Sequence, residues 1–217
     1  MQPAELTIAS KNYSSWSLQG WLLCKMAGLE FIENLIPIDD PSTKAELLLT
    51  SPSFLVPRLE HNGMSVWDTL AIAEYLAEAV PGNTLLPADL KARTHCRSIC
   101  GEMHAGFANL RSSLPMNLKA SHPAYSIWSG AQADIDRVSV IWRDCLANDG
   151  GPYLFGGLTM ADAMFAPVCT RFTTYGVELG ATCEAYRQRI MSLAPMQDWI
   201  AAAKAEPDAL EELDVEF

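Results

Sequence analysis

Four hydroxyl side chains lie within five residues near the start of the chain, on Tyr13, Ser14, Ser15 and Ser17. The apolar spacing that begins at Leu18 predicts a helix from about Ser17, and serines are preferred caps of a helix N-terminus. A hydroxyl there can donate a hydrogen bond to an anion without becoming charged, and the helix dipole adds to the stabilisation. The run therefore indicates either an anion-stabilising site or simple helix capping.

Metal and disulfide chemistry are not predicted. The six cysteines lie far apart, and none forms a Cys-x-x-Cys pair. Cys96, Cys100 and His104 fall at i, i+4 and i+8 of one expected helix face. At a rise of 1.5 Å per residue the outer two would be about 12 Å apart, too far to share an ion at bond lengths of roughly 2 Å. We expect free, buried thiols and no metal site.

The elements before and after the hydroxyl run form a βαβ unit. Leu6 to Ala9 reads as a strand, the helix from about Ser17 should stop at Gly28, and Phe31 to Ile38 reads as a second strand. Strand, helix and strand over about 30 residues predict two parallel strands with a right-handed connection.

A second group of elements completes the first half. Lys44 to Leu49 is a short helix candidate, and a proline-punctuated loop follows. Asn62-Gly63 lies between two short alternating segments, which is a strong hairpin signal. Asp68 or Thr69 can then cap a helix. The order βαβαββα predicts a thioredoxin-like α/β domain with a mixed four-stranded sheet.

The second half is predicted to be an all-α helical bundle. Residues 81–88 contain proline, glycine and asparagine and look like an interdomain linker. Only helical patterns follow, and His122-Pro123 suits a helix start because proline is favoured in a first turn. The expected helices cover residues 89–113, 123–147, 159–175, 180–193 and 195–204.

Composition restricts the class of partner. The 217 residues are 49% hydrophobic and 19% charged, as in folded globular proteins, and the net charge is -11. Binding to nucleic acid or to an anionic membrane surface requires clustered Lys and Arg, so neither partner is expected. No apolar run approaches the roughly 20 residues that span a bilayer, and residues 1–10 do not read as a secretory signal. A cytoplasmic location follows.

In several places the chain resembles the cytosolic glutathione S-transferases. Tyr13 to Ser17 lies where serine-type members, especially the zeta class, carry a Ser-Ser-Cys-Ser motif, and the spacing to Gly28-Leu29 matches without a gap. Val56-Pro57 resembles the loop whose proline is cis in that family. Trp67 to Leu76 resembles its third-helix signature, and residues 159–162 resemble its capping element in the helical half. Each match alone is weak, but their shared order and spacing predict the family over essentially the whole chain.

The resemblance implies a glutathione-binding domain at residues 1–80, a linker at 81–88 and a helical domain at 89–217 that forms the pocket for a hydrophobic electrophile. Glutathione would be the co-substrate, without a metal, and the protein would transfer it in detoxification. Ser14 matches the first serine of the motif and is the expected catalytic hydroxyl. Ser15 is its close competitor, and the Tyr13 phenol is a third option.

The remaining glutathione contacts follow from the same resemblance. Leu55, Val56 and Pro57 would present extended backbone to the cysteinyl unit. Asp68 and Thr69, at a helix start, would hold the γ-glutamyl group. Phe54-Leu55 replaces the family's usual lysine-containing pair, so Lys44 is the nearest substitute for holding the glycyl carboxylate.

The electrophile is not specified by the sequence. Candidates for its pocket lie on or just after the first helix of the second half, where core packing is the alternative: Met103, His104, Phe107, Arg111 and Met116. Trp16 replaces the motif's cysteine, and Gln19 and Trp21 replace the zeta arginines, so isomerisation of maleylacetoacetate is the second choice. A non-catalytic glutathione-fold binding module is the alternative from another class. The resemblance also implies a homodimer.

Overall fold

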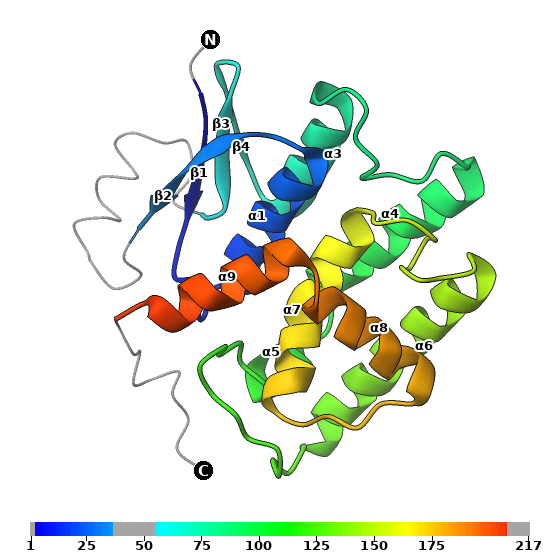
Figure 1. The fold of residues 1–217 in the computed structure, drawn as a ribbon. Helices are drawn as coiled ribbons and strands as arrows, with labels where there is room; N and C mark the ends of the chain where they lie inside the picture. The colour runs from blue at the N-terminus through cyan, green and yellow to red at the C-terminus, as the bar shows by residue number, and fades with distance from the viewer. Residues whose placement is uncertain (1–2, 37–54, 208–217) are drawn as a thin grey trace.

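A computed structural model describes residues 3–36 and 55–207 of the chain. Its first half is a four-stranded sheet in the order β2-β1-β3-β4 with two helices (Figure 1). β2 is parallel to β1, whereas β3 is antiparallel to both β1 and β4. The elements are β1 (Ala4–Ile8), α1 (Ser15–Ala27), β2 (Phe31–Leu35), β3 (Arg58–His61), β4 (Met64–Trp67) and α3 (Thr69–Ala79). The mixed sheet and the βαβ unit are confirmed; the helix expected at Lys44 to Leu49 lies outside the described residues.

Local backbone signals set the ends of these elements. Gly28 ends α1 in the left-handed conformation, with φ of 75°, and its amide bonds back to the last turn of the helix. Asn62 and Gly63 both have positive φ, at 52° and 75°, as a tight hairpin turn requires. The predicted helix stop and hairpin are therefore both confirmed. α1 itself begins at Ser15, two residues earlier than expected.

The second half consists of helices (Figure 1). They are α4 (Leu90–Ala105), α5 (Ala108–Ser113), α6 (Ser129–Asn148), α7 (Met160–Thr174), α8 (Ala181–Met191) and α9 (Ala194–Ala205). Every residue of α7 except Thr173 is buried, because this helix packs against α1, α4 and α8 in the middle of the molecule. One continuous hydrophobic core therefore joins the sheet half to the helical half.

Two predicted helices differ from the observed ones. The helix expected over residues 89–113 breaks after Ala105, because Phe107 has a positive φ of 57° and α5 starts anew behind it. The helix expected from Pro123 begins only at Ser129. Pro123 and the residue after it, expected to be helical, form a turn instead. This turn lies against the end of α7, where the His122 amide donates to the Thr174 carbonyl at 2.7 Å. Tertiary contacts prevail over the local proline signal at that point.

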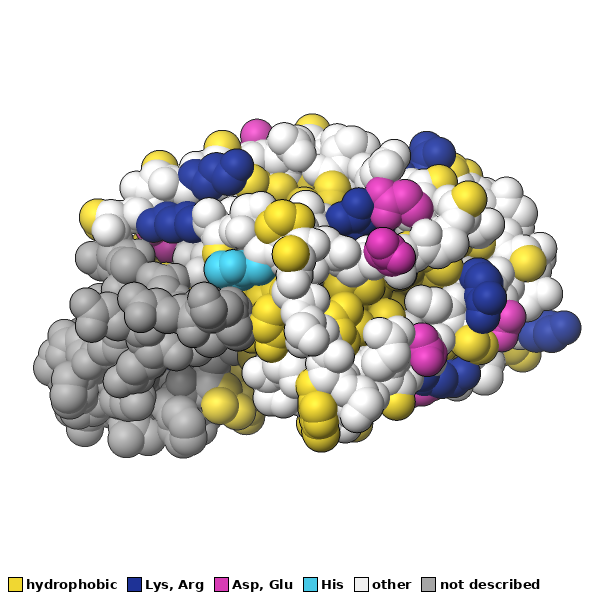
Figure 2. All heavy atoms as spheres, turned by 90° about the horizontal axis from the view of Figure 1, so that it is seen from below, with side chains coloured by type: hydrophobic (Ala, Val, Ile, Leu, Met, Phe, Trp, Pro, Cys, Tyr) yellow, Lys and Arg dark blue, Asp and Glu magenta, His cyan; other side chains and the backbone are white. Residues whose placement is uncertain are grey.

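The surface and the thiols bear on the expected partners. All six cysteines are free and buried, as predicted. Among residues 3–36 and 55–207, no cluster of three or more His, Cys, Asp or Glu could hold a metal ion. In the same ranges, no helix has the length and apolarity needed to cross a bilayer. Figure 2 shows a face on which basic and acidic side chains alternate around apolar ones, without a continuous basic patch on its described part.

Candidate functional site

The first part of the site is the N-terminus of α1. Ser14 is the N-cap, and its Oγ accepts a hydrogen bond from the Ser17 amide at 3.3 Å. The same Oγ lies 2.8 Å from the Oγ of Ser17, which is buried and accepts from the Ala9 amide at 3.0 Å. Ser14 itself is partly exposed. The sequence places a hydroxyl here because the chain turns from β1 into α1 and the first helical amides need an acceptor.

Ser15 is held by a buried cation from the helical half. The Arg171 Nη2 donates to the Ser15 Oγ at 3.2 Å, and Nη1 donates to the carbonyls of Leu114 and Arg111. Among the described residues, no carboxylate pairs with this guanidinium. Burial, and to a smaller extent the nearby charge of Arg111, lower the pKa of Arg171 to about 10. The residue still carries its charge at neutral pH, next to the hydroxyl run.

Sequence reasoning missed Arg171. The only signal for it was a single basic residue inside the largely apolar run that forms α7. A buried, unpaired charge is costly, so a residue of this kind is a candidate for contact with an anionic ligand.

An aromatic and cationic surface lies beside these serines. The ring of Trp16 packs against His104, with centroids 5.2 Å apart, and the guanidinium of Arg111 lies 5.6 Å from the Trp16 ring. Arg111 donates to the carbonyls of Met103 and His104, and burial lowers its pKa. The structure therefore brings two of the five predicted pocket residues, His104 and Arg111, next to the hydroxyl run. The others, Met103, Phe107 and Met116, are buried in the core, so their pocket role stays a prediction.

Asp68 lies at the N-terminus of α3 and links the two halves. It has an unusual positive φ of 74°, and its Oδ1 caps the helix by accepting from the Leu70 amide at 2.8 Å. Its Oδ2 lies 2.6 Å from the Nε2 of His104. Thr69 is buried, and its Oγ1 has no hydrogen-bond partner among the described residues. Asp68 already caps the Leu70 and Ala71 amides, so a polar ligand at this helix end would meet chiefly the Asp68 carboxylate and the helix dipole.

The loop before β3 completes the described site. The Val56–Pro57 peptide is cis, as the resemblance implies. Pro57 is buried against α1 so closely that a Cβ at Gly20 would lie 2.5 Å from its Cγ, which explains the glycine inside the helix. Leu55 is exposed and Val56 is partly exposed. Lys44 lies outside the described residues.

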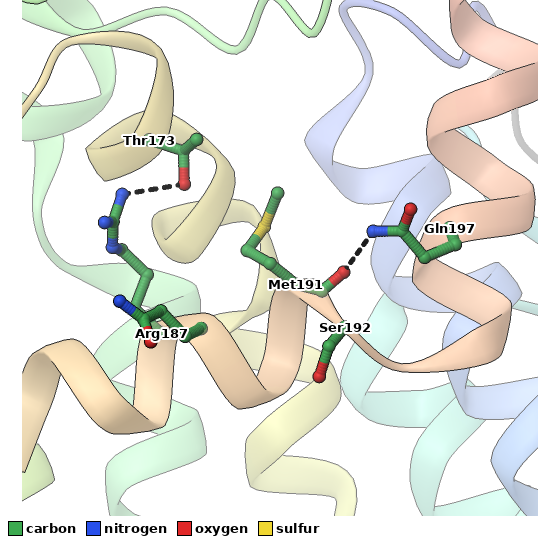
Figure 3. Close-up of a pocket in the computed structure, with 6 residues that line it drawn as sticks. Thr173, Arg187, Met191, Ser192 and Gln197 are labelled. Atoms are coloured by element: carbon green, nitrogen blue, oxygen red, sulfur yellow. Dashed lines mark hydrogen bonds between the residues drawn. The ribbon is translucent and has the colours of Figure 1, made fainter.

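A separate cavity of about 270 Å³ opens between α7, α8 and α9 (Figure 3). Its polar side chains are already engaged. Arg187 pairs with Glu184 and donates to the Thr173 Oγ1 at 3.0 Å, and Gln197 donates to the Met191 carbonyl at 2.6 Å. None of the predicted site residues lines this cavity, so it is not part of the candidate site.

Comparisons with known proteins decide the family. Residues 13–79 match the model of the glutathione S-transferase N-terminal domain, and residues 101–204 match that of the C-terminal domain. The chain belongs to the glutathione S-transferase family. It is 26% identical to maleylacetoacetate isomerase of Mus musculus over 94% of both chains. It is also 24% identical to glutathione S-transferase L1 of Arabidopsis thaliana, over 71% of this chain and 61% of that protein.

Solved structures agree on the fold of this glutathione S-transferase. A Burkholderia glutathione transferase homologue with bound glutathione superposes with a TM-score of 0.73 at 21% identity, over 94% of this chain and 100% of that one. Maleylacetoacetate isomerase of Anaeromyxobacter dehalogenans, also with bound glutathione, gives a TM-score of 0.64 at 21% identity, over 96% and 98% of the two chains. The predicted fold class, a thioredoxin-like half followed by helices, is confirmed.

Proposed function

We propose that this glutathione S-transferase binds glutathione with its sulfur at the N-terminus of α1, where the Ser14 hydroxyl stabilises the thiolate for attack on an electrophile. The observation that carries the proposal is the position of the partly exposed Ser14 at the helix end, next to Ser15, whose hydroxyl accepts from Arg171. Lowering a thiol pKa by two units takes about 2.7 kcal/mol. A hydrogen bond to a charged group supplies about 1.5 to 3 kcal/mol, and the helix end about 0.3 to 1 kcal/mol.

The Ser14–Ser17 pair explains how the proton can be presented. Each hydroxyl has one proton and two acceptor sites, so the 2.8 Å contact between the two oxygens works in either direction. When Ser17 donates to Ser14, it can still accept from the Ala9 amide, and the Ser14 proton becomes free for the sulfur. In this arrangement the buried Ser17 supports Ser14 without touching glutathione.

Ser15 and Tyr13 remain the competing donors. Ser15 is partly exposed, and its oxygen already accepts from Arg171, which would make its own proton a better donor. The side chain of Tyr13 is buried, so a phenol-to-sulfur contact would require the ring to move. Ser14 is preferred over Ser15 because it matches the first serine of the family motif, and Ser15 over Tyr13 because the phenol is buried.

The rest of glutathione is assigned to the two neighbouring segments. The backbone of Leu55 and Val56, in the exposed loop next to Pro57, would pair with the cysteinyl unit as an added strand. The γ-glutamyl carboxylate would lie at the N-terminus of α3 beside Thr69, with its ammonium on Asp68. Lys44 remains our prediction for the residue that binds the glycyl carboxylate.

The electrophile pocket favours a substrate with both a flat apolar part and an acidic group. Trp16 and His104 offer ring faces. Arg111, which feels the charge of Asp134, and the buried Arg171 provide two cations that pair with no carboxylate among the described residues. Because burying an unpaired charge costs several kcal/mol, an anionic substrate group would be bound favourably there. This also supports the second candidate function, a glutathione-dependent isomerase of the maleylacetoacetate type, for which several relatives are named.

Binding and turnover with matched substrates test the proposal. Retention on immobilised glutathione is measured first, followed by turnover of a neutral aryl halide, of an otherwise similar aryl halide carrying a carboxylate, and of maleylacetoacetate. We expect conjugation to be faster with the acidic aryl halide than with the neutral one. Turnover of maleylacetoacetate alone would select the isomerase, and binding without any turnover would select the non-catalytic module.

The assembly and location are part of the same proposal. We expect a cytoplasmic homodimer in which the first half of one subunit packs on the second half of the other. Three large apolar side chains that are exposed on β4 and at the start of α4 support it, namely Met64, Trp67 and Leu90. Leu90 is the most exposed of the three, at 67%.

A further inference from the structure

The loop that carries the candidate catalytic hydroxyls is bound by a carboxylate from the far end of the chain. Glu206 follows α9, and its Oε1 accepts from the Lys11 amide at 2.6 Å. Its Oε2 accepts from the Ser10 Oγ at 2.7 Å and from the Asn12 amide at 3.2 Å. These contacts join residues 194 to 196 positions apart, so they tie the end of the helical half to the loop between β1 and α1.

Ser10 passes this constraint on to the hydroxyl run. While its hydroxyl donates to Glu206, its oxygen faces the amides of Asn12 at 3.1 Å and Tyr13 at 3.4 Å. Its carbonyl accepts from the Ser14 amide at 3.0 Å. The orientation of the Ser10 side chain therefore helps to fix the backbone conformation of Tyr13 and Ser14.

Glu206 is itself held in place. Its amide donates to the Ala203 carbonyl at 3.2 Å, and the Lys119 Nζ donates to its carbonyl oxygen. The loop also has a second, independent set of contacts. The Asn12 side chain bonds to Asn117 at 3.0 Å and to the Leu118 amide at 2.7 Å, and Trp199 donates to the Lys11 carbonyl at 2.9 Å. Removing the Glu206 carboxylate should therefore loosen the loop locally and leave the packing of the two halves intact.

We propose that Glu206 is a positioning residue for catalysis, which holds the β1–α1 loop so that the Ser14 hydroxyl lies where the glutathione sulfur binds. Glu206 does not touch the substrate; it acts through Ser10 on Ser14. The inference rests on the proposed role of Ser14. Charge-assisted hydrogen bonds to one carboxylate are the strong class, and a misplacement of about 1 Å at a reacting group can cost about 100-fold in rate.

The test compares Glu206→Ala, Glu206→Gln and Ser10→Ala with Glu178→Ala, a control at an exposed glutamate that makes no hydrogen bond or ion pair in the described part of the chain. For Glu206→Ala we expect kcat/KM to fall by about 10- to 100-fold at neutral pH. The pH profile should shift upwards, and the ultraviolet absorbance of bound thiolate should decrease at that pH. Glu206→Gln keeps one acceptor oxygen and should lose less. The KM for glutathione should change less than kcat, because Asp68 and Val56 are untouched.

The double variant Ser10→Ala with Glu206→Ala tests the route through Ser10. If Glu206 acts through Ser10, the two losses should be clearly less than additive. An unshifted pH profile in both Glu206→Ala and Ser10→Ala, with turnover within twofold of the parent, would overturn the inference. If Glu206→Ala does not fold, Glu206→Gln and Ser10→Ala decide by the same measures. If Ser14→Ala, made in the otherwise unchanged protein, has no effect on turnover or on the pH profile, the proposed function itself is refuted. The two failures are therefore distinguishable.

Discussion

Replacing Ser14 tests two roles, its observed capping of α1 and its proposed donation to the thiolate. Ser14→Ala removes the acceptor for the Ser17 amide and the proton for the sulfur together. Loss of an N-cap costs about 1 kcal/mol of stability, and loss of a hydrogen bond to a thiolate about 1.5 to 3 kcal/mol of transition-state stabilisation. We expect kcat/KM at neutral pH to fall roughly 10- to 150-fold.

Two further substitutions at the same position serve as controls. Glycine is a much better N-cap than alanine, so Ser14→Gly should restore most of the stability while remaining as inactive as Ser14→Ala. Ser14→Thr keeps the hydroxyl and should keep most of the activity. Thermal unfolding measures the first role, and the pH dependence of kcat/KM measures the second.

The sign of the pH effect follows from the chemistry. If the hydroxyl stabilises the thiolate, its removal raises the pKa of bound glutathione, and the lost rate should return as the pH rises through that higher value. An unshifted Ser14→Ala profile beside a shifted one for Ser15→Ala or Tyr13→Phe would refute the assignment and move the role to that neighbour.

Four other outcomes are expected. Asp68→Asn retains a helix-capping oxygen but loses the charge that meets the ammonium, so glutathione affinity measured by calorimetry should fall by about 1.5 to 3 kcal/mol, and an unchanged affinity would remove Asp68 from the site. Arg171→Gln should reduce kcat/KM more for an acidic electrophile than for a neutral one, whereas equal losses would contradict a role in charge recognition. Leu90→Glu should dissociate the dimer, so that sedimentation gives the monomer mass; a dimer that persists in this variant would exclude Leu90 from the interface. Burial raises the pKa of Asp162 from 3.8 to about 6, so the folded state binds a proton at this group more tightly than the unfolded state does. The contribution of Asp162 to the free energy of unfolding should therefore fall as the pH rises between those values, and the difference between the parent and Asp162→Asn in pH-dependent unfolding should measure it.

The parts of the fold that could be predicted depend on short-range signals. Gly28, Asn62 and Gly63 were read correctly because a positive φ is a property of one or two residues. The break at Phe107 and the late start of α6 were missed. Phe107 adopts a conformation that is uncommon outside glycine, and the turn at His122 is held by a carbonyl more than 50 residues away. Neither cause can be read from the local sequence.

The candidate site divides in the same way. The hydroxyl run and the helix start at Asp68 could be found because their residue types and spacing carry the chemistry. The proximity of His104 and Arg111 to Trp16 follows from tertiary packing, in which α4 lies on α3 and α7 and both of these helices contact α1; a motif does not encode this packing. The domain limits and the role of each site residue stay predictions.

The site is built from both halves of the chain, and this has a consequence for how it can vary. Several contacts cross between the halves within the site, among them those of His104 with Asp68, of Arg171 with Ser15, and of Glu206 with the β1–α1 loop. Each places a polar or charged side chain of the helical half against a residue proposed to bind or activate glutathione, or against the loop that carries it. We therefore expect a substitution in the helical half that changes the electrophile pocket also to alter thiolate formation, because Arg171 is proposed to serve both sites. Variants of Arg171 should show this coupling directly, with the pH profile and the substrate preference changing together.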